Sequence, residues 1–125
     1  MRRITLLAFI VFYLAGCAGK KEPLTVHGKP VGHWVAELKQ PDAKARKKAV
    51  AALGQVGKAD ATAIPALIGA LGDKDQRVRN EAVLALLKLG PDAREALPAL
   101  ENAKADRNAT VREYVGKAIA RIRGE

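Results

Sequence analysis

Serine is absent from this 125-residue sequence, which also contains only one cysteine, one tryptophan and two histidines. Beyond the N-terminal segment, the hydroxyl nucleophiles are therefore reduced to three threonines, Thr25, Thr62 and Thr110. Nucleophilic catalysis needs such a group activated by a base, and the sequence offers no support for that arrangement. A single cysteine cannot form a disulfide within the chain. We expect the chain not to be an enzyme.

Metal and cofactor ligands are scarce as well. His27 and His33 are the only histidines, no second cysteine is available, and few carboxylates lie near them. We interpret both histidines as solvent-exposed, with His33 facing away from Trp34, rather than as a metal site. The glycines fall at the ends of expected helices and form no phosphate-binding loop. No metal and no cofactor is expected.

Aromatic residues make up only 4% of the sequence, whereas 49% of it is hydrophobic and 28% is charged. This composition is typical of helices built from alanine and leucine, and the length allows one domain. The formal charge is +9, from 22 basic and 13 acidic residues. A basic excess makes anionic partners plausible: nucleic acid, lipid head groups, acidic polysaccharide or acidic protein.

The first residues indicate the compartment. Met1, Arg2 and Arg3 form a short positive segment, and the run from Ile4 to Leu14 is apolar apart from Thr5. This run is too short to span a bilayer as a helix, which needs about 20 residues, but it fits the apolar core of an export signal. It ends in Leu-Ala-Gly-Cys at residues 14–17. The segment resembles a bacterial lipoprotein signal peptide.

That resemblance implies cleavage after residue 16, a diacylglycerol on Cys17 and acylation of the new N-terminus. Two or more acyl chains give a stable membrane anchor. Ala18 replaces the aspartate that retains many such lipoproteins in the inner membrane, so an outer membrane is favoured where one exists. We expect residues 1–16 to be the signal peptide and 17–29 a lipidated, flexible tether in the cell envelope, with a mature charge of +7 after loss of Arg2 and Arg3. The alternative is an uncleaved apolar N-terminus with an incidental cysteine.

The rest of the chain repeats with a period of 33 residues. Arg46, Arg79 and Arg112 share this spacing without a gap. Other positions keep the same register, among them Leu53, Leu86 and Ile119, then Ala52, Ala85 and Ala118, then Trp34, Leu67 and Leu100, then Ala49, Ala82 and Val115, then Ala45, Val78 and Val111. A fixed period of 20 to 50 residues indicates stacked structural repeats.

Each copy predicts a short helix, a turn and a longer helix. Residues Val31, Trp34, Val35 and Leu38 fall on one helical face. Asp42, Asp75 and Asn108 precede the longer helices, where a short polar side chain caps free backbone N–H groups. Pro65 and Pro98 fit the first turns of the short helices, and Gly57 and Gly90 fit left-handed C-caps.

These residues resemble HEAT repeats, in particular the short bacterial kind sometimes called PBS-lyase-like. The family pattern is matched twice, by Pro65, Asp73, Val78 and Arg79 and by Pro98, Asp106, Val111 and Arg112, while the first copy departs with Gly32, Gln40, Ala45 and Arg46. The resemblance implies an all-α, right-handed solenoid of three helical hairpins, at about residues 30–57, 58–90 and 91–125. It also implies that the aspartates and arginines tie adjacent repeats together, and a stack of three is near the minimum for stability.

In this architecture the longer helices line a concave surface, and basic residues predominate among their expected exposed positions. The candidate binding residues are Lys44, Lys47, Lys48, Arg77, Asn80, Leu84, Lys88, Tyr114, Lys117 and Arg121. Leu84 and Tyr114 are the expected apolar anchors. The hypothesis is a membrane-tethered scaffold or adaptor that binds an acidic protein; the alternatives are solvation only, peripheral binding of anionic lipid or polysaccharide, or nucleic-acid binding if the chain is not exported. No nucleic acid is expected for an exported chain.

Overall fold

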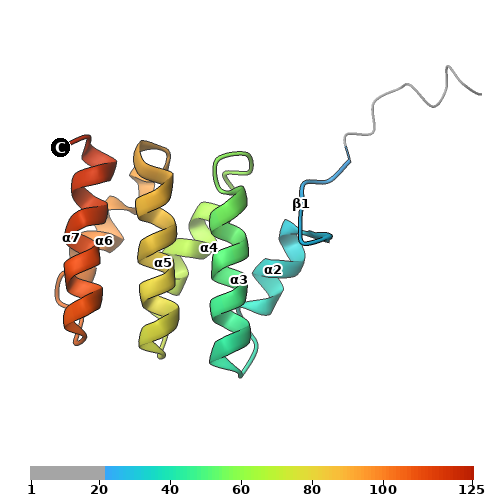
Figure 1. Cartoon of the computed structure of the whole chain (residues 1–125), viewed down its shortest axis with the longest axis horizontal. Helices are drawn as coiled ribbons and strands as arrows, with labels where there is room; N and C mark the ends of the chain where they lie inside the picture. Colours follow the sequence, from blue (N-terminus) through green and yellow to red (C-terminus); the bar gives the residue numbers. More distant parts are fainter. Residues whose placement is uncertain (1–21) are drawn as a thin grey trace, which may run out of the picture.

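A computed structural model describes residues 22–125, so the proposed signal peptide at 1–16 and the lipidation site Cys17 lie outside the described residues. A short hairpin, β1 (Thr25–Val26) and β2 (Lys29–Pro30), precedes the helices α2 (Val31–Glu37), α3 (Ala43–Val56), α4 (Ala63–Ala70), α5 (Gln76–Leu89), α6 (Leu97–Ala103) and α7 (Ala109–Arg123). A 3-10 helix, η1 (Gly90–Ala96), joins α5 to α6. The long helices α3, α5 and α7 stand side by side in one layer, with the short helices behind them (Figure 1). The expected all-α stack of three helix pairs is confirmed.

The long helices begin where the sequence predicts. The side chain of Asp42 accepts hydrogen bonds from the backbone N–H groups of Lys44 and Ala45, at 3.2 and 3.3 Å. Asp75 accepts from the N–H of Arg77 at 2.8 Å, and Asn108 accepts from that of Val111 at 3.1 Å. Each cap satisfies backbone donors that a helix start otherwise leaves free, and each therefore sets the first residue of its helix.

The ends of the long helices differ from the prediction. Gly57 has φ −55° and ψ −28°, so it is not a left-handed cap. A Cβ added to Gly57 would lie 2.8 Å from Cδ1 of Leu89, so a larger residue here would require the Leu89 side chain to shift. Gly90 does have a positive φ of 58°, but its ψ of −134° lies outside the left-handed helical region. The left-handed cap is found at Gly124, which ends α7 with φ 80° and ψ 27°.

The segment predicted to be flexible, residues 17–29, has an ordered end, because Thr25 to Pro30 form an antiparallel hairpin that pairs Val26 with Lys29. His27 and Gly28 form its turn with φ values of 50° and 71°, the positive range that a two-residue hairpin turn requires. Val26 is buried, and its carbonyl accepts a 3.1 Å hydrogen bond from Nε1 of Trp34. The sequence pattern did not predict this hairpin, because a strand of two residues is too short to produce a periodic pattern. Its contact with the core is the hydrogen bond from Trp34 to Val26.

Two expectations for α2 also need correction. Val31 and Trp34 are buried as expected, but Val35 is 37% exposed. The His33 ring does not face away from Trp34; it packs edge-on against it, with 5.1 Å between the ring centroids. Val35 instead faces the open groove between α2 and α4, so only part of the predicted face reaches the core.

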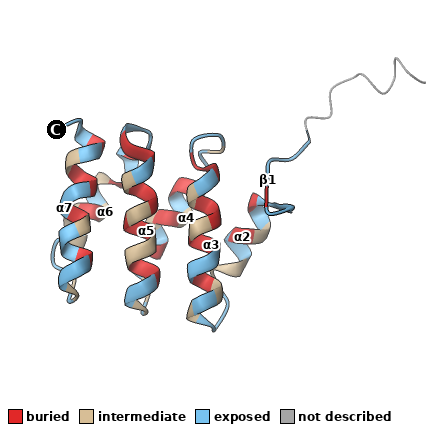
Figure 2. Cartoon of the chain, in the orientation of Figure 1, coloured by how far each residue is buried: buried red, intermediate tan, exposed pale blue. Residues whose placement is uncertain are grey.

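The core runs without a break through all three repeats. Figure 2 shows buried residues concentrated where the helices face one another. The five largest fully buried side chains are Leu53, Leu67, Leu86, Leu100 and Ile122, and they come from every repeat. A Cβ added to Gly54 would lie 2.9 Å from Cβ of Ala85, so α3 and α5 approach each other very closely there. Each repeat thus completes the core of its neighbour.

Candidate binding face

Two buried arginines link consecutive repeats and form an Arg–Asp ladder. Arg46 donates from Nε and Nη2 to the carboxylate of Asp73, at 2.9 and 3.1 Å. Arg79 binds Asp106 in the same way, at 2.8 and 3.1 Å. The side chains of all four residues are at most 13% exposed. Bidentate pairs between neighbouring repeats have an architectural role, so these residues are structural rather than part of a ligand site.

The aspartates of the ladder stay ionised under ordinary conditions. Burial acts to raise the pKa of Asp73, but hydrogen bonds from Arg46 and from the N–H of Asp75 outweigh it, and the pKa lies below its usual value. The pKa of Asp106 is lowered for the same reasons, with Arg79 and the N–H of Asn108 as the donors. Both carboxylates are therefore fully used within the fold.

The ten predicted binding residues lie on α3, α5 and α7, and we call the surface that they form the long-helix face. Seven of them are exposed, namely Lys44, Lys47, Lys48, Arg77, Lys88, Lys117 and Arg121, and three are half-buried, namely Asn80, Leu84 and Tyr114. Because α3, α5 and α7 lie side by side, residues 33 apart in sequence become neighbours across this layer (Figure 1). The predicted residues thus come from all three long helices.

The positive charge is not spread evenly over this face. Arg77 is paired with Asp75 at 2.9 Å, and Lys117 is paired with Glu113 at 2.7 Å. Within residues 22–125, no carboxylate pairs with the remaining five cations, Lys44, Lys47, Lys48, Lys88 and Arg121. Three of these five lie on α3, around an open depression of about 500 Å³ whose lining also includes Asp42, Ala45 and Ala51. Unpaired charge is therefore concentrated on the first repeat, which spacing alone did not indicate.

The uncharged members of the face are less available than expected. Tyr114 packs partly against the core, and Nζ of Lys117 lies 4.9 Å from its ring centroid. Leu84 keeps part of its side chain exposed near the middle of the layer. The Oδ1 atom of Asn80 is buried, and no donor among the described residues reaches it. Of the two predicted anchors, Leu84 is the freer one.

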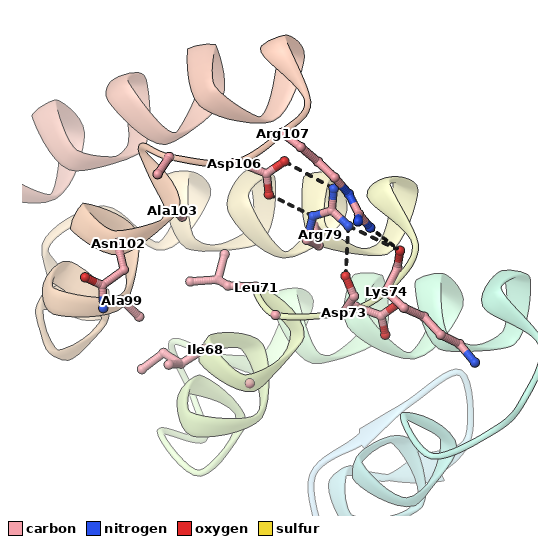
Figure 3. A pocket seen from close by; sticks show the side chains of 13 residues that line it. Ile68, Leu71, Asp73, Lys74, Arg79, Ala99, Asn102, Ala103, Asp106 and Arg107 are labelled. Carbon is pink, nitrogen blue, oxygen red and sulfur yellow. Dashed lines mark hydrogen bonds and ion pairs between the residues drawn. The ribbon is translucent and has the colours of Figure 1, made fainter.

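A second hollow, which the sequence did not lead us to expect, lies on the short-helix side. A groove of about 740 Å³ opens between α4 and α6, and Ile68, Leu71, Ala99 and Ala103 line it (Figure 3). The Arg79–Asp106 pair also borders it, and these two charged groups are already paired with each other. A smaller groove of about 300 Å³ between α2 and α4 includes the exposed Val35. The sequence did contain one indication of these grooves: Val35 and Ile68, which line the smaller and the larger groove, are 33 residues apart and so occupy the same position in their repeats.

Two further observations concern the described residues only. Among residues 22–125, no three histidine, cysteine or acidic side chains come close enough together to hold a metal ion. No helix in that range has the length and hydropathy needed to cross a bilayer.

Comparison with known proteins agrees with the geometry. A family model described as HEAT repeats matches residues 31–122, which span all three helix pairs. No curated protein matches the chain at a significant level. HEAT repeats typically mediate protein–protein interaction or scaffolding, and the family is generally not enzymatic. With its helix pairs, its Arg–Asp ladder and this match, the chain belongs to the HEAT-repeat family.

Proposed function

We propose that this protein is a membrane-tethered scaffold of the bacterial cell envelope whose long-helix face binds an acidic segment of another protein. The observation that carries the proposal is the cluster of Lys44, Lys47 and Lys48, which line one open depression. Asp42 also lines it, but its carboxylate caps α3 and forms no ion pair with any of the three lysines. Exposed cations attract an anionic partner and raise its rate of association. Tethering through Cys17 would hold this face close to the membrane.

The choice of an acidic protein rests on the surroundings of the cluster. Alanines lie between the lysines, and Leu84 lies on the neighbouring helix. Apolar surface next to unpaired charge suits a polypeptide that has both acidic and apolar side chains. A purely electrostatic ligand would make no use of the apolar surface.

The test is a charge reversal on the described face. We expect the variant Lys44→Glu, Lys47→Glu, Lys48→Glu to lose the acidic proteins that the parent chain retains from an envelope extract. A matched control reverses three exposed cations away from this face, with Lys39→Glu, Lys58→Glu and Arg94→Glu, so that both variants have the same net charge. Circular dichroism would confirm that both fold.

Three outcomes would contradict the proposal. Identical partners for both variants would remove the long-helix face as the binding site. Equal loss in both would show that only net charge matters. If the purified protein bound anionic vesicles or acidic polysaccharide in a salt-sensitive way, without any protein partner, the ligand would be a lipid or polysaccharide surface rather than a protein segment.

A further inference from the structure

The two ends of the repeat stack differ in what covers them. At the N-terminal end, β1 packs on α3 and β2 packs on α2, and Val26 is buried beside Trp34. At the other end, no element within residues 22–125 packs on the outer side of α7 (Figure 1). In the described part of the chain, the stack is therefore closed at one end and open at the other.

The open end contains the third arginine of the ladder column. Nη1 of Arg112 donates to the backbone carbonyl of Asp106 at 2.7 Å. Nη1 of Arg46 and of Arg79 make the matching bonds to the carbonyls of Gln40 and Asp73, each at 2.9 Å. All three guanidinium groups are thus held by the same backbone position of their own repeat.

Only Arg112 lacks a carboxylate within residues 22–125. Arg46 and Arg79 each bind the aspartate that lies 27 residues later, in the next repeat. No carboxylate in that range pairs with Arg112, whose side chain is exposed. A guanidinium that is already oriented, and whose Nε and Nη2 are not engaged by the described residues, loses little entropy when it binds a carboxylate.

The helix around Arg112 is shaped for close contact. Val50 and Val83 occupy the same position in the first two repeats, and both are fully buried. The corresponding residue of the third repeat, 33 residues after Val83, is Gly116. Gly116 is exposed, and a Cβ added to it would meet no atom within 4 Å. On the same side of α7, Ala109 lies about two turns before Gly116 and Ala120 lies about one turn after it. We call this surface, defined by Ala109, Arg112, Gly116 and Ala120, the end face.

The internal pairs show what such a site binds. Besides the arginine, Asp73 and Asp106 each accept a 2.9 Å hydrogen bond from the backbone N–H two residues later, at Asp75 and Asn108. Those two residues are the N-caps of α5 and α7. The ladder therefore binds an aspartate that is fixed in a turn two residues before a helix cap.

We propose that the end face docks a second, helical protein, and that Arg112 binds an aspartate of this partner located two residues before the N-cap of one of its helices. A second copy of this chain does not meet the requirement. The corresponding position in its first repeat is Gln40, which has no carboxylate, and the hairpin at Thr25–Pro30 covers that end of the stack. This proposal concerns a different surface from the long-helix face and does not depend on it.

Site-specific photocrosslinking in the native host tests the proposal on the full chain. The photoreactive residue p-benzoylphenylalanine replaces the exposed Glu113, which lies at the edge of the end face. We expect one adduct with another protein, mapped by mass spectrometry to an aspartate at a helix start. Arg112→Gln, which removes the guanidinium, and Gly116→Trp, which blocks close approach, should each lower the adduct yield on the order of tenfold.

Matched controls separate docking from misfolding. Arg94→Gln removes an exposed arginine elsewhere, and Gly32→Trp fills another exposed glycine site that has no atom within 4 Å. Both should leave the yield unchanged, as should Lys44→Glu, Lys47→Glu, Lys48→Glu. Exchange of the mapped aspartate of the partner for asparagine should match Arg112→Gln.

The proposal is overturned by an adduct between two copies of this chain, by no adduct at position 113, or by an adduct that Arg112→Gln and Gly116→Trp leave intact. An adduct lost on reversal of the α3 lysines would also overturn it, because the partner would then lie on the long-helix face.

Discussion

At the scale of single residues, the three arginines of the ladder column provide an internal comparison. Arg46, Arg79 and Arg112 have the same position in their repeats and the same hydrogen bond to their own repeat, but only the first two have a carboxylate partner among the described residues. The first two are buried, whereas Arg112 is exposed. Identical residues in one column therefore have different energetic roles, which depend on whether a repeat follows them in the described stack.

We predict that Arg79→Ala lowers the free energy of unfolding by about 3 kcal/mol, because it leaves the Asp106 carboxylate buried without its partner. Arg112→Ala, at the corresponding position, should change it much less. Urea denaturation followed by circular dichroism measures both. Equal losses in the two variants would show that the bond to the repeat's own carbonyl, rather than the ion pair, is the stabilising contact.

The lowered pKa values of Asp73 and Asp106 predict an acid-sensitive fold. A carboxyl whose pKa is lower in the folded state stabilises the protein above its unfolded pKa of about 3.9, and this contribution is lost as the pH falls through the folded pKa. The free energy of unfolding should therefore stay level from about pH 7 to pH 5 and fall below about pH 4. Urea titrations at each pH provide the measurement.

The control for this pH dependence is the double variant Arg79→Met, Asp106→Leu, which removes one ion pair while keeping apolar volume. Its stability should fall less steeply in acid than that of the parent. If the stability of this variant fell with pH as steeply as that of the parent, other carboxyls would control the acid transition. Asp75 is one such group, since its pKa is lowered chiefly by the hydrogen bond from the Arg77 side chain.

At the scale of secondary-structure elements, two helical glycines have opposite environments. Gly54 lies where α3 meets α5, and an added Cβ there would come within 2.9 Å of Cβ of Ala85. Gly116 lies on the outer side of α7, where an added Cβ would meet nothing within 4 Å. Both residues reduce helix propensity, but only Gly54 is required by packing among the described elements.

We predict that Gly54→Ala lowers the free energy of unfolding by about 1 kcal/mol, because overpacking outweighs the gain in helix propensity. Gly116→Ala should instead raise it by about 0.5 to 1 kcal/mol, since only the propensity gain remains. Thermal and urea denaturation of the two variants would show the opposite signs. A destabilising Gly116→Ala would contradict the open environment of the end face.

At the scale of the whole molecule, each repeat contacts mainly its neighbours, and the stack presents two distinct surfaces. The long-helix face spans all three repeats, although its unpaired lysines are concentrated on α3. The end face belongs to α7 alone. A HEAT-repeat scaffold with the two proposed surfaces would hold two partners at once.

The proposed anchor leads to a prediction about location. Cys17→Ser should shift the protein from the membrane fraction to the soluble fraction, because the serine cannot receive the thioether-linked lipid. Mass spectrometry of the parent N-terminus should find a mature chain that starts at a lipidated Cys17. The control Lys58→Ala, an exposed change far from the N-terminus, should leave the distribution unchanged. An unmodified, uncleaved N-terminus would refute the tether.

The sequence by itself determined the period, which is visible as identical residues 33 positions apart. It also determined the three helix pairs and the N-caps at Asp42, Asp75 and Asn108, because helices and caps depend on residues within a turn or two of each other. The tertiary structure alone decided that Val35 is exposed, that Val26 is buried in a hairpin, and that α3 carries the unpaired lysines. It also decided that Arg112 has no carboxylate among the described residues. The physical reason is the separation along the chain, because ion pairs and burial involve side chains about 30 residues apart in sequence. A repeating pattern indicates where such side chains lie in each repeat, but it does not show which groups they contact.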